Sequence, residues 1–465
     1  MCQPELTHIA MISFVHLLIN QPEKAHSPPI GVLGLVAAMR HDGLEVEFEQ
    51  FVHCRGTPLS PEALCKTLFE AHQIVAVSLM INVLPLLVLA LRLLRQIDPD
   101  KIVVVGGPGM VGIGAEVLRG TPEIDVVAFG EGESTVGPLF RALIAGRSLR
   151  AVPGIHYRQQ STLLSTRPAP RSEDLDRLPL PDYAGIDFSK YHSVGLMASR
   201  GCPFGCTFCD VAPAWGRRNT QRSVDHVLDE MQMLFEEHGI RDVGFADDLF
   251  IVDRKWVEEF CTRKVSRGIT VRWRCCGHVN LAKPSLAQAM ADAGCRSIFF
   301  GIESGSNAVL KRIKKNFSIE KAFAVVEQTL SHMEVSTNFM WGFPGETARE
   351  LDKTLFAARY VEQLGASTSL VMLAPLSQAP MSAGAHPIRF DPTVANIFCE
   401  DYRELVESYL PVWFDLIASS PLVYCAFYHF ESSHIAASSE TVSFYARLKD
   451  AFGILSQPSP LWQKV

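Results

Sequence analysis

The sequence predicts a multidomain α/β protein in which two regions each alternate short apolar strands with amphipathic helices. The chain has 465 residues, which is too long for one ordinary core. Apolar residues make up 48% of it and charged residues 20%, as in globular proteins. Strand and helix patterns alternate over residues 5–147 and again over 192–374, as parallel sheets with helical crossovers require.

Charge and leader patterns exclude several classes of protein. The net charge of −7 leaves no bulk cationic surface, so we expect no nucleic-acid partner. No basic region precedes an apolar stretch at the start, so we expect no signal peptide and a cytoplasmic location. Residues 74–91 carry no charge and approach the length of a membrane span. Their β-branched start and Pro85 favour a buried strand followed by a helix, so we expect no membrane span.

The first region predicts a doubly wound parallel sheet of the Rossmann or flavodoxin type. Its expected strands are 8–14, 45–51, 74–80, 101–106 and 125–129. Helical patterns fall at 30–41, 61–72, 84–97 and 112–119, with another after Glu133. Ligands bind such sheets beyond the carboxyl ends of the strands, where glycine-rich loops 106–109 and 130–133 stand. No dinucleotide fingerprint follows the first strand, which disfavours nicotinamide.

The second region predicts six βα units, which suggest an open or partial barrel similar to a TIM barrel. Its expected strands are 193–198, 242–246, 271–275, 297–302, 336–340 and 367–373. A proline-rich connector with one hairpin at 154–166 precedes it, and a small helical cap follows. The expected division is a first domain at 1–148, a linker at 149–190, the partial barrel at 191–375 and the helical C-terminal domain at 376–465.

Three of the twelve cysteines fall within eight residues, directly after the first strand of the second region. Cys202, Cys206 and Cys209 stand in a loop with Pro203 and Gly205, so their thiolates could converge on one centre. Iron–sulfur clusters are held by cysteine thiolates, normally four, and a structural zinc site also needs four ligands. Three ligands leave one metal position open, as catalysis on a metal requires. The other nine cysteines are most simply buried hydrophobic residues.

This loop resembles the CxxxCxxC signature of the radical S-adenosylmethionine (SAM) superfamily, including the aromatic Phe208 before the last cysteine. The resemblance implies a [4Fe-4S] cluster whose open iron chelates SAM and a 5′-deoxyadenosyl radical formed by reductive cleavage. Segments 245–250, 301–306 and 342–347 match at the expected strand ends. With the upstream sheet, residues 5–375 resemble the cobalamin-binding subfamily of methyltransferase-like (class B) radical SAM enzymes, so residues 1–148 are expected to bind vitamin B12.

The resemblance also implies contacts to SAM. Phe208 and Gly342 are expected near the adenine, and Asp247 or Asp248 would receive the SAM ammonium group. A loop turn or a helix N-cap is the structural alternative for the two aspartates. Glu303, with Ser304 beside it, would receive a ribose hydroxyl, because an unpaired carboxylate at the end of an apolar strand is costly. A structural ion pair is the alternative for Glu303.

For cobalamin, the residues expected to face the corrin lie in loops at the carboxyl ends of the first sheet. They are Gln21, Ser78, Met80, Gly106, Gly107, Pro108, Gly130 and Glu131. Many relatives carry an Asp-x-His-x-x-Gly motif whose histidine binds cobalt. Here His53 and Gly56 have the spacing, but Phe51 replaces the aspartate and the position follows the wrong strand. We therefore expect no cobalt-binding histidine from this motif.

The expected activity is methylation of an unactivated carbon of a small-molecule biosynthetic intermediate, with methylcobalamin as the methyl donor. Cyclisation or ring rearrangement without methyl transfer is an alternative on the same scaffold, and a noncatalytic cobalamin or redox sensor is another. The cofactors implied are the [4Fe-4S] cluster, SAM and cobalamin. The partners implied are a small-molecule substrate and an external one-electron reductant of the flavodoxin or ferredoxin type.

Overall fold

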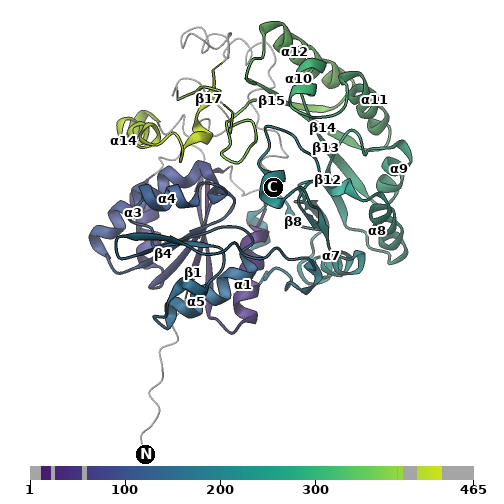
Figure 1. Cartoon of the computed structure of the whole chain (residues 1–465). Coiled ribbons are helices and arrows are strands. Elements are labelled where there is room, and N and C mark those ends of the chain that lie inside the picture. The colour runs from purple at the N-terminus through teal and green to yellow at the C-terminus, as the bar shows by residue number, and fades with distance from the viewer. Residues whose placement is uncertain (1–11, 22–26, 55–59, 385, 391–405, 432–465) are drawn as a thin grey trace, which may run out of the picture.

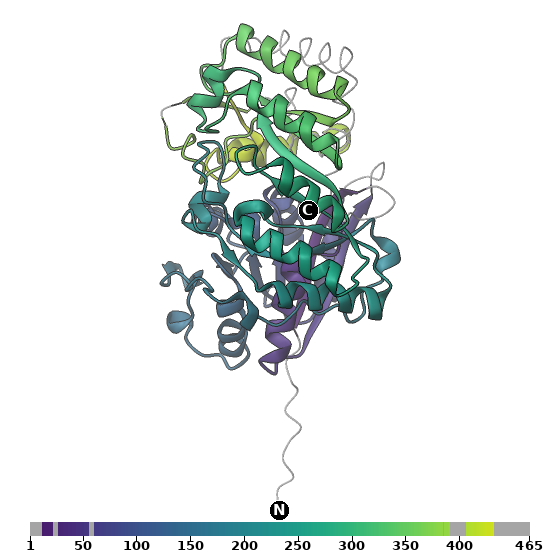
Figure 2. The same ribbon diagram turned by 90° about the vertical axis from the view of Figure 1, so that its right-hand side faces the viewer.

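The computed structural model describes residues 12–21, 27–54, 60–384, 386–390 and 406–431. Two large sheets, one mostly and one wholly parallel, lie side by side in it, each flanked by helices (Figure 1). The predicted α/β class is therefore confirmed. Figure 2, turned by 90°, shows that the helices around the second sheet form an outer layer.

The first sheet has seven strands in the order β2-β1-β3-β4-β5-β6-β7. Strands β1 to β5 are parallel, and their order is that of a flavodoxin-like doubly wound sheet. These strands are β1 Ile12–Gln21, β2 Val46–Cys54, β3 Ile74–Ser78, β4 Ile102–Gly106 and β5 Val126–Ala128. Strand β1 runs to Gln21, well past the predicted end at residue 14, and the predicted start at residues 8–11 lies outside the described residues.

Helices cover both faces of this sheet, because its strands carry apolar side chains on both faces. Ile12 and Phe14 pack on the side of α1 and α5, whereas Val15 and Leu17 pack on the side of α2, α3 and α4. The helices are α1 Ile30–His41, α2 Pro61–Glu70, α3 Leu84–Ile97, α4 Gly114–Gly120 and α5 Glu133–Ile144. Segment 74–91 forms β3 and much of α3, and no described helix combines the length and apolarity needed to cross a bilayer.

The predicted hairpin is present as β6 Ile155–Gln159 and β7 Thr162–Ser165, and it extends the first sheet. Strand β6 pairs antiparallel with β5, so Val126 lies opposite Tyr157. This part of the expected linker therefore completes the sheet of the first region. The sequence pattern predicted the turn between the two strands but did not indicate which edge the hairpin would join.

The second sheet has six parallel strands in the order β15-β14-β13-β12-β11-β8, the order expected for a partial barrel. They are β8 Val194–Leu196, β11 Asp242–Phe245, β12 Arg272–Gly277, β13 Cys295–Glu303, β14 Glu334–Trp341 and β15 Ser367–Met372. Its helices lie on the outer side (Figure 1). They are α7 Val224–His238, α8 Arg254–Ser266, α9 Pro284–Asp292, α10 Asn307–Arg312, α11 Ile319–Leu330 and α12 Ala348–Gln363.

Short elements complete the described fold. The remaining strands and α-helices are β9 Ser199–Arg200, β10 Thr220–Gln221, α6 Val211–Trp215, β16 Ile388–Arg389, β17 His429–Phe430 and α14 Val406–Ser419. The 3₁₀ helices are η1 Ile81–Val83, η2 Pro108–Met110, η3 Leu149–Ala151, η4 Leu175–Arg177, η5 Phe188–Lys190, η6 Phe250–Val252 and η7 Cys425–Phe427. Trp413 on α14 and Tyr424 pack into the core of the first sheet, so these tail aromatics are core residues.

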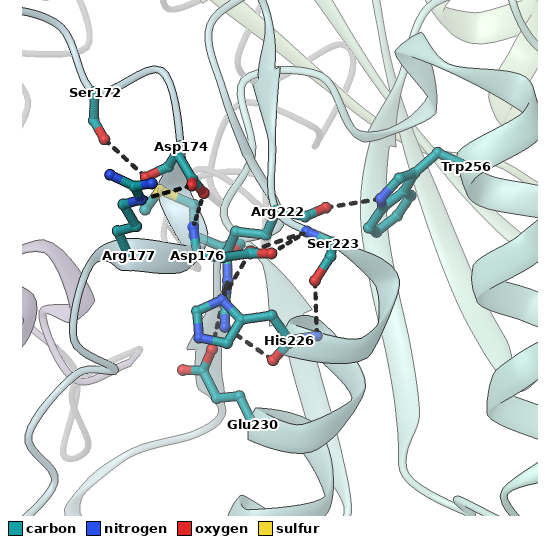
Figure 3. A network of polar contacts seen from close by, with 10 residues as sticks. Ser172, Asp174, Asp176, Arg177, Arg222, Ser223, His226, Glu230 and Trp256 are labelled. Carbon is teal, nitrogen blue, oxygen red and sulfur yellow. Dashed lines mark hydrogen bonds and ion pairs between the residues drawn. The ribbon is translucent and has the colours of Figure 1, made fainter.

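The connector is fastened to the second region by a polar network at the start of α7 (Figure 3). Asp176 accepts a hydrogen bond from the backbone N–H of Ser223 at 3.0 Å and contacts His226 at 2.9 Å. Arg222 forms a buried ion pair with Glu230 at 2.5 Å. These contacts hold the connector against the barrel, so the path between the two sheets is well defined.

Candidate functional site

The loop that carries the three clustered cysteines leaves β9 through Gly201, whose φ is +94°. A Cβ atom on Gly201 would lie 2.1 Å from the carbonyl oxygen of Arg218, so only glycine fits there. The loop is anchored farther on by Thr207, whose N–H donates to the carbonyl of Ile313 at 3.1 Å. Backbone contacts therefore determine the course of the loop, and Gly201 is a site residue that the sequence prediction did not include.

Cys202, Cys206 and Cys209 are free thiols, each partly buried. Burial raises the pKa of all three, to about 12 for Cys209. The charge of Cys206 further raises the pKa of Cys202 and of Cys209. Among the described residues, no group of three or more His, Cys, Asp or Glu side chains is arranged to hold a metal ion. The donor chemistry suits an iron–sulfur cluster, and ligation by these three residues stays a prediction.

Lys315 is a charged site residue that the sequence prediction missed. It is buried, and its Nζ atom lies 3.2 Å from Oε1 of Glu303 and 5.9 Å from the ring centre of Phe208. Burial alone lowers the pKa of Lys315, but Glu303 and then Cys206 raise it above its usual value. In return, Lys315 partly offsets the rise that burial causes in the pKa of Cys206. A positive charge is thus held beside the cysteine loop.

Glu303 ends β13 with a left-handed backbone, at φ +74°, which is strained for a residue with a side chain. Its second carboxylate oxygen accepts a hydrogen bond from the side-chain amide of Asn338 at 3.3 Å. The structure therefore shows the ion-pair alternative for Glu303, and a ribose contact stays a prediction. Ser304 is fully buried, and its hydroxyl bonds to that of Thr354 at 3.0 Å within the fold.

The two aspartates after β11 are both engaged with the segment that leads into the cysteine loop. Asp247 accepts hydrogen bonds from the N–H of Ala198 at 3.0 Å and the hydroxyl of Ser199 at 2.5 Å. Burial raises its pKa to about 7, although those two bonds lower it. Asp248 accepts from the N–H of Gly201 at 2.8 Å. The expected ammonium contact stays a prediction for both.

The N-cap alternative for these aspartates is wrong, because another residue fills that role. Asp253 accepts hydrogen bonds from the N–H groups of Lys255 and Trp256 at the start of α8. An aspartate next to the first helical residue can reach those unpaired donors. Asp247 and Asp248 lie too early in the chain for this contact and act on the cysteine loop instead.

Phe208 and the turn after β14 come together, as their shared expected role requires. The ring of Phe208 meets that of Phe343 edge to face, with 6.0 Å between the ring centres. Gly342 has a φ of +85° and donates its N–H to the buried carboxylate of Glu346 at 2.7 Å. Burial raises the pKa of Glu346 to about 7. The structure thus brings Phe208 against the turn that Gly342 begins, and a contact of either residue with adenine stays a prediction.

Four of the expected corrin residues form one compact edge of the first sheet. Gly106 ends β4 beside Ser78 of β3, and Gly107 and Pro108 follow directly. Gly107 has a φ of +96°, and a Cβ atom there would lie 2.7 Å from Oγ of Ser78. Met80, on the same loop as Ser78, is 46% exposed, which leaves its side chain open to a ligand. Close packing against Ser78 and Leu79 therefore requires glycine at position 107, and a corrin contact at this edge stays a prediction.

The other expected corrin residues do not share one location or one kind of surroundings. Gln21 ends β1, but its side chain lies outside the described residues, as do the side chain of His53 and the whole of Gly56. Gly130 has a φ of +80° and begins the loop after β5. Glu131 is buried, and its carboxylate accepts from the N–H of Ser172 at 2.8 Å and lies 3.5 Å from Arg200. Glu131 therefore contacts the connector and the second region, and a corrin contact stays a prediction.

One loop bridges the two candidate sites. After β15, Ser377 donates its hydroxyl to the carbonyl of Val111, next to η2 in the first region, at 3.2 Å. Four residues later, Met381 donates its N–H to the carbonyl of Thr207 in the cysteine loop at 2.8 Å. A chain segment of five residues, 377–381, therefore connects the glycine-rich edge of the first sheet with the cysteine loop of the second.

Comparison with known proteins matches the same two regions. The B12 binding domain family covers residues 23–139, and the Radical SAM superfamily covers residues 196–358. An uncharacterized methyltransferase of Pyrococcus horikoshii is 31% identical over 277 residues, 58% of this chain and 60% of that protein. The anaerobic magnesium-protoporphyrin IX monomethyl ester cyclase of Rubrivivax gelatinosus is 30% identical over 286 residues, 58% of this chain and 51% of that protein. The chain thus spans between half and two thirds of these relatives.

Among solved structures, the radical SAM methyltransferase TsrM of Kitasatospora setae, determined with cobalamin and a [4Fe-4S] cluster bound, has a similar fold. The TM-score is 0.67 at 18% identity, covering 83% of this chain and 77% of that one. The cobalamin-dependent radical enzyme OxsB gives a TM-score of 0.66 at 17% identity, over 81% of this chain and 60% of that one. With a B12-binding and a radical SAM domain in one chain, the protein belongs to the cobalamin-binding radical SAM family.

Proposed function

We propose that the protein is a cobalamin-dependent radical SAM enzyme that methylates an unactivated carbon of a small-molecule biosynthetic intermediate. The observation that carries this proposal is the bridge from Val111 through Ser377 and Met381 to Thr207. Through these two hydrogen bonds, segment 377–381 links the glycine-rich edge of the first sheet to the cysteine loop of the second. Two cofactors bound at these places would face one substrate space.

Different residues of the chain would bind the cluster, bind the corrin and exclude water. Cys202, Cys206 and Cys209 would hold the cluster, and the edge around Gly107 would receive the corrin. When bound, the cluster and SAM supply a hydrogen-abstracting radical, and methylcobalamin supplies the methyl group. Lys315 adds a fixed positive charge beside the sulfur donors. Phe343 and Glu346, which are buried in the turn after β14, and the ring of Phe208 would exclude water on the SAM side.

The relatives' names support methyl transfer. They include the cytidylyl-2-hydroxyethylphosphonate methyltransferase of Streptomyces wedmorensis at 27% identity and the hopanoid C-2 methylase of Rhodopseudomonas palustris at 28%. Cyclisation without net methyl transfer is the second candidate, because the similarity to the cyclase of Rubrivivax gelatinosus extends over 286 residues. We expect the electron donor to be a flavodoxin or ferredoxin, and the site of action to be the reducing cytoplasm.

The proposal is tested by anaerobic reconstitution with iron, sulfide and hydroxocobalamin, followed by SAM and a chemical reductant. We expect iron–sulfur and corrin absorption bands and slow release of 5′-deoxyadenosine without any added substrate. Cys206→Ala should lose most of the iron and all SAM cleavage but keep cobalamin. Cys276→Ala, a cysteine outside the loop, should keep both. A protein that binds cobalamin but never cleaves SAM would instead be a sensor.

Methylation and cyclisation differ in their products. With candidate substrates and SAM that carries a deuterated methyl group, methylation gives S-adenosylhomocysteine and a labelled product. Cyclisation gives neither, although both reactions give 5′-deoxyadenosine. A product formed without label would therefore contradict methyl transfer and favour the cyclase alternative.

A further inference from the structure

Arg200 is a largely, but not fully, buried cation between the two candidate cofactor loops. Its side chain is 11% exposed, and its guanidinium reaches the loop after β5 in the first region. Nη2 lies 2.5 Å from Oε1 of Glu133, and Nη1 lies 3.5 Å from Oε2 of Glu131. Glu131 lies in the glycine-rich loop at 130–133, and Glu133 ends that loop as the first residue of α5. Their side chains are 5% and 14% exposed. Two carboxylates of the first sheet therefore converge on one arginine of the second region.

The backbone of Arg200 is held as firmly as its side chain. Arg200 pairs with Thr220 in the short β9–β10 ladder, and its carbonyl accepts a hydrogen bond from Nη2 of Arg171 at 2.9 Å. Gly201 follows and admits no side chain, and Cys202 comes next. Gly201 is the one residue between Arg200 and Cys202, and its N–H is held by the carboxylate of Asp248 at 2.8 Å. A displacement of the loop at 130–133 would be transmitted to the cysteine loop over two residues.

The connector closes this cluster from the other side. Arg171 also donates to the carbonyl of Trp215 at 2.5 Å and lies 3.9 Å from Oε1 of Glu131. Two arginines and two glutamates are therefore gathered where the first sheet, the connector and the second region meet. Removing ionic groups from water is costly, so such a cluster forms only where the groups compensate one another. It also makes the relative position of the surfaces specific, since each charge has a fixed partner.

We propose that Arg200 is a positioning residue that keeps the loop at 130–133 in register with the cysteine loop, and so sets the separation of the cobalamin and the cluster. This inference rests on the proposed function, because it requires both cofactors. It assigns Glu131 and Glu133 to the alignment of the two domains. Their place in a glycine-rich loop had suggested contact with the corrin for Glu131.

The test measures the magnetic interaction between the two centres and needs no substrate. Wild-type protein is reconstituted with iron and sulfide, loaded with cob(II)alamin and reduced. The relaxation of the cob(II)alamin electron spin is then recorded with the cluster oxidised and reduced. In Arg200→Gln, which removes the positive charge and leaves a shorter polar side chain, we expect iron and cobalamin contents within twofold of wild type. The relaxation enhancement by the reduced cluster should fall several-fold.

Three further variants keep the result interpretable. Arg200→Lys retains the charge and should restore part of the enhancement. Glu133→Gln removes only the 2.5 Å contact and should give an intermediate value; it replaces Arg200→Gln if that variant loses a cofactor. Arg272→Gln breaks an exposed ion pair between Arg272, the first residue of β12, and Asp242, the first residue of β11. This variant should match wild type.

The outcomes separate this inference from the function on which it rests. Unchanged relaxation enhancement in Arg200→Gln or, where that variant loses a cofactor, in Glu133→Gln would overturn the positioning role while leaving the proposed function intact. An equal loss in Arg272→Gln would also overturn it, since any lost surface ion pair would then suffice. Wild-type protein that takes up no iron or no cobalamin would overturn the proposed function, and the inference with it.

Discussion

Nζ of Lys315 lies 3.2 Å from Oε1 of Glu303, and both residues are only 6% exposed. Glu303 adopts a left-handed backbone at the end of β13, and Lys315 follows α10. The pair therefore connects a strand end with the loop that follows the next helix, directly beside the cysteine loop. Its two charges compensate each other, so neither can be removed alone without leaving the other buried and poorly paired.

Replacing Lys315 by methionine should therefore be strongly destabilising. Among the residues that the structure describes, the carboxylate of Glu303 would keep only the side-chain amide of Asn338 as a hydrogen-bond partner. Removing one member of a buried ion pair costs about 3–5 kcal/mol. Anaerobic urea unfolding should show a loss of that size. Lys311→Met, on the exposed side of α10, is the control and should change stability by about 0.5 kcal/mol or less. Equal losses in both variants would contradict the buried-pair interpretation.

Gly201→Ala should disturb the cysteine loop more than the strain of a positive φ alone would. The new Cβ atom would lie 2.1 Å from the carbonyl of Arg218, in addition to the strain of φ +94°. Gly216→Ala is the matched control, because Gly216 has a φ of +65° but nothing within 4 Å of a Cβ atom. We expect Gly216→Ala to cost about 1 kcal/mol. Gly201→Ala should lower the free energy of unfolding by more than this and should also lower the iron content after reconstitution. Equal iron contents in the two variants would contradict a specific role for Gly201 in the cysteine loop.

Gly107→Ala should impair cobalamin uptake while sparing the cluster. Its Cβ atom would enter the space of Ser78 Oγ, at 2.7 Å, and push the loops after β3 and β4 apart. Gly43→Ala, at a φ of +78° with open space around it, controls for backbone strain. Spectroscopic titration with hydroxocobalamin should show weaker binding for Gly107→Ala only. Loss of iron together with cobalamin would mean that the two halves of the protein do not load independently.

Glu346 should make stability depend on pH in a predictable direction. Burial raises its pKa from the ordinary value of 4.5 to about 7 in the folded protein. Between these values the folded state holds a proton that the unfolded state has released, so stability falls as pH rises through this window. A tenfold difference in proton affinity between the two states corresponds to about 1.4 kcal/mol. Glu346→Gln keeps an oxygen acceptor for the N–H of Gly342 and should flatten this dependence in urea unfolding between pH 5 and 7.

An unchanged pH dependence in Glu346→Gln would contradict this prediction. If the slope of stability against pH is the same in wild type and Glu346→Gln, another group is responsible. Asp247 is the alternative source, because burial raises its pKa to about 7 as well. Asp247→Asn in the same measurements would then separate the two carboxyl groups.

Local sequence determined the repeating units and the donor set of this protein. The helices α1 and α3 begin and end at the residues that the sequence pattern predicts. Such patterns are readable because a helix or strand must bury one side of itself whatever its partner is. The spacing of Cys202, Cys206 and Cys209 is likewise a property of one short loop. These features identified the family and the cofactors it implies.

Only the tertiary structure decided which charges meet. Lys315 and Glu303 lie twelve residues apart, and Arg200 and Glu133 lie 67 apart, so no periodicity relates the members of either pair. The edge that the hairpin β6–β7 joins was undetermined for the same reason. A buried charge is stable only beside a partner that packing brings within a few ångströms, and that partner depends on how whole elements dock. The contacts that align the two domains are therefore products of packing.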